Sequence, residues 1–113
     1  MSSFRRRNNI MSIKLFVDDE RPCPKGWIPA FNYDEAIASL RWENVEELSL
    51  DHDLGNGPTG YDIIKVLEEW YHDGGQWREK VPKIVSCHSS NPVGRKRIET
   101  VIEILKLLRK EKE

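Results

Sequence analysis

Short apolar runs alternate along the chain with longer segments in which apolar residues recur every three or four positions. The runs at 13–17, 27–31, 45–50 and 82–87 have the length and side-chain types of strands, and helical spacing is found at 33–42, about 60–72 and about 92–110. Strands that alternate with helices predict a parallel sheet with right-handed crossovers. We therefore expect an α/β fold, a three-layer sandwich with about four strands in the order 2-1-3-4. Pro29 would confine the second strand to an edge.

Local signals place the ends of the predicted helices. Asn32 followed by Glu35, and Thr59 followed by Asp62, have the spacing of a capping box. Asn91-Pro92 is a favourable start for the last helix, because proline at the first helical position loses no needed N–H group. Gly74-Gly75 should end the second helix, and the segment 76–80 is then predicted to be a loop.

Length and composition predict one globular domain. The 113 residues suffice for a single core, which we assign to 12–113, preceded by a basic tail at 1–11 that we expect to be disordered; Met11 is an alternative start. No apolar run approaches the roughly 20 residues of a membrane span. Two cysteines are too few for a disulfide framework, which favours reduced thiols and a cytoplasmic location. No obligate protein partner is evident.

Charge is unevenly distributed, although the net charge is only −1. Residues 1–17 carry +4, residues 18–79 carry −10 and residues 80–113 carry +5. An acidic centre next to a basic C-terminal third suits a cation site that faces an anion site. A solvated helix face rich in lysine and arginine explains much of the positive charge without any ligand.

Titratable side chains follow three of the predicted strands. Asp18-Asp19 follows the first, Asp51-His52-Asp53 the third, and His88-Ser89 the fourth. The carboxyl ends of parallel strands share one edge of a sheet, where ligands bind in open α/β folds. A polar loop is the alternative explanation, because Asp, Asn and Gly are ordinary turn residues.

Four motifs in this order resemble the cyclic-phosphate processing receiver-like domains, a narrower family within the receiver (flavodoxin)-like fold. They are Leu15 to Pro22, Ser49 to Gly55, Thr59 to Asp62, and His88 to Arg95, where the one-letter sequences read LFVDDERP, SLDHDLG, TGYD and HSSNPVGR. An ordinary receiver domain differs, because here no fifth strand with its lysine follows and His88-Ser89 replaces a lone Ser or Thr. The resemblance implies a role with 2′,3′-cyclic phosphate ends of RNA or with a cyclic nucleotide, and hence in RNA repair.

The acidic side chains suit a divalent cation. Asp18, Asp19 and Asp51 are hard oxygen donors, and Mg²⁺ prefers a few carboxylates together with water and phosphate oxygens. Zn²⁺ is the second choice, since it prefers histidine and cysteine.

The remaining polar residues suit a phosphate ester. Ser89, Asn91 and Arg95 lie at the start of the last helix, whose N-terminus favours anions. His52 and His88 are candidate general acid and base, with Asp53 orienting a histidine or a water. Alternatively, Asn91 only caps the helix, Asp53 caps the glycine turn, and Arg95 is solvated.

We expect metal-dependent hydrolysis of a cyclic phosphate, with Asp51, His52, Asp53 and His88 as catalytic residues. The alternative is a receiver-like switch that is phosphorylated on Asp51, or a sensor that binds a nucleotide without turnover. Every residue named would also serve recognition alone.

Overall fold

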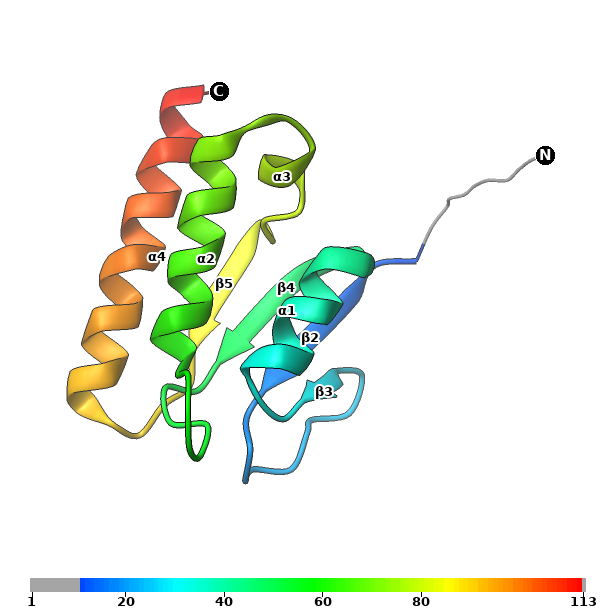
Figure 1. The fold of residues 1–113 in the computed structure, drawn as a ribbon, viewed down its shortest axis with the longest axis vertical. Helices are drawn as coiled ribbons and strands as arrows, with labels where there is room; N and C mark the ends of the chain where they lie inside the picture. Colours follow the sequence, from blue (N-terminus) through cyan, green and yellow to red (C-terminus); the bar gives the residue numbers. More distant parts are fainter. Residues whose placement is uncertain (1–10, 113) are drawn as a thin grey trace.

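The computed structural model describes residues 11–112, so the predicted tail lies outside the described residues except for Met11. Its sheet contains the parallel strands β2 (Ile13–Val17), β3 (Ile28–Ala30), β4 (Val45–Leu50) and β5 (Ile84–Cys87). The strand order is β3-β2-β4-β5 (Figure 1). In chain order this is 2-1-3-4, so the predicted topology is confirmed.

The helices are α1 (Tyr33–Trp42), α2 (Gly60–Asp73), α3 (Gly75–Glu79) and α4 (Pro92–Lys112). The prediction of a loop at 76–80 is wrong, because the short helix α3 occupies most of this segment. Gly74 and Gly75 have positive φ angles of 77° and 56°, which turn the chain out of α2. Trp77 then packs on Trp70, with 5.1 Å between ring centroids. This tertiary contact holds a helix too short to be stable alone.

Side chains cap the helices as the sequence predicts. Asn32 Oδ1 accepts a hydrogen bond from the Glu35 N–H at 2.9 Å, and Glu35 reaches back to the Phe31 N–H. At the start of α2, Asp62 accepts from the Thr59 N–H at 2.7 Å. These bonds satisfy N–H groups that have no partner inside a helix.

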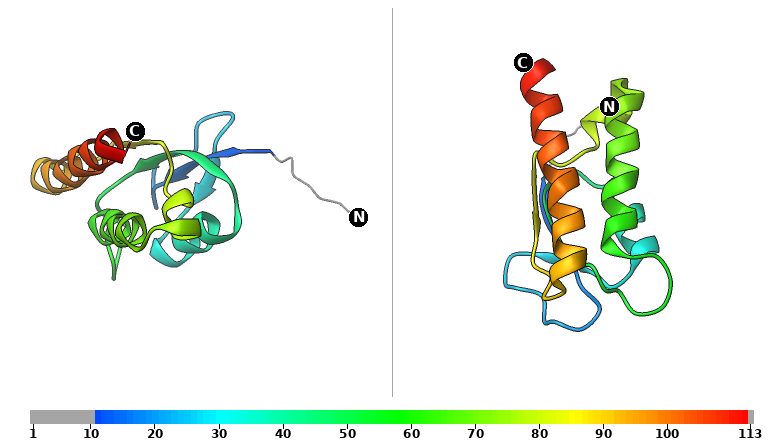
Figure 2. Two further views of the ribbon diagram at one scale, coloured as in Figure 1. Left: turned by 90° about the horizontal axis from the view of Figure 1, so that it is seen from above. Right: turned by 90° about the vertical axis from the view of Figure 1, so that its left-hand side faces the viewer.

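The predicted receiver-like α/β fold is confirmed, although within residues 11–112 the helices cover one face of the sheet, which gives two layers where three were expected. Helices α1 and α2 lie over one face, and α4 packs beside α2 along β5, whereas within residues 11–112 no helix covers the other face (Figures 1 and 2). The reason is the connectivity. The connection from β2 to β3 contains Pro22, Pro24 and Gly26 and forms no helix, and among the described residues α4 is the last element.

Burial along the strands follows this two-layer arrangement. Leu15, Val17, Leu48 and Leu50 face the helices and are fully buried. Residues of the opposite parity form the helix-free face, where Ile84 is 54% exposed. This alternation is typical of a sheet with one solvated face.

Candidate functional site

The strand register brings the predicted acidic residues to one edge of the sheet. Val17 pairs with Leu50, and Leu50 pairs with Cys87, so these three helix-facing residues form one row. Since successive side chains point to opposite faces, the residues that follow them project toward the helix-free face. These are Asp18, Asp51 and His88, each of which can place one ligand atom within 4.8 Å of the other two.

Asp18 is held by several hydrogen bonds. Its side chain is fully buried, and Oδ1 accepts from the backbone N–H groups of Glu20 and Arg21, both at 2.8 Å. Oδ2 lies 2.9 Å from His88 Nε2. Burial alone would raise the pKa of Asp18, but these hydrogen bonds outweigh it and leave the pKa below its ordinary value.

His88 lies on the helix-free face, with both ring nitrogens close to protein groups. Nδ1 is 2.7 Å from Ser49 Oγ, and Nε2 faces Asp18. The imidazole stacks on the Phe16 ring, with 4.3 Å between centroids and 8° between planes. A buried hydroxyl, a carboxylate and an aromatic ring thus fix its orientation.

Asp51 stands at the end of β4, where a close helix approach positions it. Its Oδ1 accepts from the His52 N–H at 2.8 Å. Gly60, the first residue of α2, is so close that a Cβ atom would lie 2.0 Å from the Asp51 carbonyl oxygen. The glycine therefore lets α2 begin directly against the strand end.

A cavity of about 280 Å³ opens at this edge. Five carboxylates and one guanidinium line it, together with Gly55 and Ser90; the charged residues are Asp18, Asp19, Glu20, Arg21, Asp51 and Asp53. Such a concentration of carboxylates is unfavourable unless a cation compensates it. The donors are oxygens of carboxylates, which fit Mg²⁺ better than Zn²⁺. Asp18 and Asp51 would hold it with oxygens that can lie within 4.8 Å of each other, and Asp19, the third predicted ligand, also lines the cavity.

His52 and Asp53 belong to a second hydrogen-bond network, which joins the β4 loop to α4. His52 Nδ1 is 2.9 Å from Asp53 Oδ1, and Asn91 Nδ2 donates to Asp53 Oδ2 at 3.3 Å. These two contacts hold the pKa of Asp53 below its ordinary value. The His52 ring packs so tightly on Gly94 that a Cβ there would lie 2.2 Å from His52 Cγ.

The predicted phosphate-binding residues are mostly engaged inside the protein. Asn91 Oδ1 caps α4 by accepting from the N–H groups of Val93 and Gly94, both at 3.1 Å. Ser89 is buried and accepts from the Asn91 N–H at 3.1 Å. Arg95 pairs with Glu99 at 3.0 Å. Among the described residues, neither these three nor His52 and His88 line the cavity.

Arg21 is a candidate site residue that the sequence reasoning did not select. It donates to the His88 carbonyl oxygen, and its Nε is 4.0 Å from Asp18 Oδ2. It is the one basic side chain among the described residues that line the cavity. Its position three residues after Asp18, in the turn that ends β2, was the available signal.

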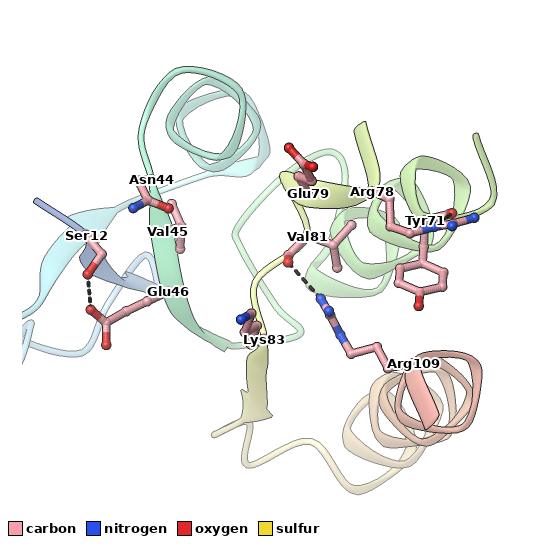
Figure 3. Close-up of a pocket in the computed structure, with 10 residues that line it drawn as sticks. All are labelled: Ser12, Asn44, Val45, Glu46, Tyr71, Arg78, Glu79, Val81, Lys83 and Arg109. Carbon is pink, nitrogen blue, oxygen red and sulfur yellow. Dashed lines mark hydrogen bonds between the residues drawn. The ribbon is translucent and has the colours of Figure 1, made fainter. Parts of the chain in front are cut away.

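A larger cavity, about 600 Å³, lies at the other end of the strands (Figure 3). Its arginines serve the fold. Arg109 donates to the carbonyl oxygens of Val81 and Pro82, and Arg78 donates to the carbonyl of Tyr71 and lies over its ring. Neither the predicted metal ligands nor the histidines reach this cavity.

A four-stranded parallel sheet in this order, with an acidic cavity at its carboxyl edge, defines a receiver-like α/β domain. The model of the family described as "Cyclic-phosphate processing Receiver domain" matches residues 13–104. The chain belongs to this family. No curated protein and no solved structure matches the chain at a significant level. Within residues 11–112, no helix has both the length and the apolar character needed to cross a membrane.

Proposed function

We propose that the protein binds Mg²⁺ at the carboxyl edge of the sheet and hydrolyses a cyclic phosphate, such as the 2′,3′-cyclic phosphate end of an RNA or a nucleotide. The observation that carries the proposal is the cavity in which five carboxylates surround a single arginine. The family description supports a phosphate-bearing ligand.

The cation explains how an anion could enter so acidic a cavity. When bound, Mg²⁺ supplies positive charge that offsets both the carboxylates and the phosphate. Asp18 is suited to hold it because its carboxylate is already oriented and ionised. Asp19 and Asp51 supply further oxygens at the same edge.

Arg21 is suited to bind the phosphate. A guanidinium carries five N–H donors, and one already goes to the His88 carbonyl. The side chain is 46% exposed, so other donors are open to a phosphate oxygen. Asn91 would reach a phosphate only by giving up its present contacts, Ser89 would have to become accessible, and Arg95, although 48% exposed, does not line the cavity.

Hydrolysis adds water across one P–O bond of the ring, so that a hydroxyl leaves and a phosphate monoester remains. Asp51 is the best-placed base for the proton of that water, since it lines the cavity at a strand end. The other candidates are His52 and His88. Nδ1 of His52 and both ring nitrogens of His88 are in contact with protein groups. Asp53 lines the cavity and keeps His52 oriented.

The test incubates RNA ending in a 2′,3′-cyclic phosphate with the protein, with and without Mg²⁺, and follows the chemistry of the RNA end. We expect a monoester to form only with Mg²⁺. Asp51→Asn should abolish turnover, whereas Asp73→Asn, the same change at the far end of α2, should leave it intact. Turnover by the Asp51→Asn variant at the wild-type rate would contradict the proposal.

A sensor that binds the cyclic phosphate without turnover is the second candidate function. It is favoured by the engagement of both histidines in contacts within the protein. Mg²⁺-dependent binding of the RNA end with no change in its chemistry would select the sensor. Acyl-phosphate formation on Asp51 from a small phosphodonor would instead select a receiver-like switch.

A further inference from the structure

Three side chains on the helix-free face form a continuous hydrogen-bond chain that ends at the metal site. Ser49 Oγ is 2.7 Å from His88 Nδ1, and His88 Nε2 is 2.9 Å from Asp18 Oδ2. Ser49 is 7% exposed and Asp18 is 2% exposed, so water has little access to either end. Ser49 has no other role in the site described above.

The chemistry of the groups sets the direction of these bonds. An ionised carboxylate only accepts hydrogen bonds, so Nε2 of His88 must carry a proton and donate it to Asp18. In a neutral imidazole the other nitrogen then has a lone pair, which accepts the hydroxyl proton of Ser49. The Asp18 carboxylate therefore selects the Nε2–H tautomer of His88, and the Ser49 hydroxyl supports it by donating to Nδ1.

The hydrogen bond from His88 helps to fix the orientation of the Asp18 carboxylate. A carboxylate offers about four acceptor positions. Glu20 N–H, Arg21 N–H and His88 occupy three of them. The group is thus fixed in orientation while it keeps acceptor capacity for a cation.

We propose that Ser49 is a positioning residue, which supports the Nε2–H tautomer and the ring orientation of His88 and through them helps to orient Asp18 for Mg²⁺. The inference rests on the proposed function for the Mg²⁺ at Asp18. The hydrogen bonds from Ser49 through His88 to Asp18 do not depend on that function. Ser49 acts through His88 rather than as a nucleophile, because its hydroxyl is buried beneath the sheet face and does not line the cavity.

The first test reads the His88 tautomer by ¹⁵N NMR of the imidazole, in protein without metal. We expect the Nε2–H form in the wild type and a larger share of the Nδ1–H form in Ser49→Ala, because Nδ1 has then lost its donor. Ser86→Ala is the matched control, because Ser86 pairs with Ser49 in the sheet and is exposed on the same face. Ser49→Thr keeps the hydroxyl and should restore the wild-type tautomer.

The second test measures Mg²⁺ affinity by calorimetry for the same variants. Loss of a group that orients a metal ligand typically costs 10- to 100-fold in affinity. We expect a loss of at least about tenfold for Ser49→Ala, and wild-type affinity for Ser86→Ala and Ser49→Thr.

The inference is overturned if His88 has the Nδ1–H form in the wild type, or if Ser49→Ala and Ser86→Ala behave alike in both measurements. Covalent labelling of Ser49 by a serine-directed phosphonofluoridate would also overturn it, since a positioning residue should not react. A wild-type protein that binds no Mg²⁺ contradicts the proposed function instead, and the metal-free tautomer comparison then decides the hydrogen-bond chain by itself.

Discussion

The contact between Gly94 and His52 helps to join the loop after β4 to α4. The glycine leaves room for the imidazole, and any larger residue would collide with it. His52 in turn contacts Asp53, which lines the cavity. The sequence reasoning regarded His52 as a catalytic candidate and gave Gly94 no role beyond its place in the motif.

We predict that Gly94→Ala destabilises the protein by about 1–3 kcal/mol, the usual range for overpacking. In a His52→Ala background the same change should become neutral or stabilising, because alanine is a better helix former than glycine by up to about 1 kcal/mol. Urea unfolding of the four proteins in a double-mutant cycle measures the coupling. Additive effects would show that the two residues do not meet.

At the level of elements, the two faces of the strands differ in how deeply their side chains are buried. Helix-facing residues such as Leu15, Val17, Leu48 and Leu50 are fully buried, whereas the opposite face contains exposed or half-buried residues such as Glu47 and Ser86. The alternation is visible in the second half of β4, where Glu47-Leu48-Ser49-Leu50 alternates polar with apolar residues. It was the signal that one face of the sheet lacks a helix.

We predict that Leu48→Ala costs about 2–5 kcal/mol in the free energy of unfolding, the usual range for a buried leucine. Ile84→Ala, a similar truncation on the helix-free face, should cost less than about 1 kcal/mol because the side chain is 54% exposed. Chemical denaturation of both variants makes the comparison. A similar cost for both would mean that something covers the second face in solution.

Across the whole molecule, we predict that the acidic cavity makes stability dependent on divalent cations. Bound Mg²⁺ should stabilise the folded state by about 1.4 kcal/mol at ten times its dissociation constant. Thermal unfolding with and without Mg²⁺ measures this gain. Asp19→Asn should raise the stability of the metal-free protein by relieving repulsion and should lower the gain from Mg²⁺. An equal gain in this variant would remove Asp19 from the site.

Acid should weaken the protein through the same carboxylates. The pKa values of Asp18 and Asp53 lie below the ordinary value of 3.8, so their contribution is complete above that pH and is lost as pH falls through the lowered values. Unfolding free energies measured between pH 6 and pH 2 should therefore decline below about pH 4. Asp18→Asn should be less stable at neutral pH and show a shallower decline. An unchanged slope would contradict the lowered pKa of Asp18.

Much of the molecule was determined by the sequence alone, because periodicity, caps and breakers act locally. Four strands, three long helices, the strand order and the family could all be predicted, and so could the meeting of Asp18, Asp51 and His88 at one edge. The meeting of these three side chains follows from the strand register, since the residues after paired positions of neighbouring parallel strands lie at the same end of the sheet.

Only the tertiary structure decided how each polar group is used. Two histidines that each come just after a strand have different partners in space: His52 lies against Gly94, and His88 lies between Ser49 and Asp18. Arg21 lines the cavity while Arg95 turns to Glu99. These outcomes depend on contacts between segments far apart in the chain, which local patterns do not encode.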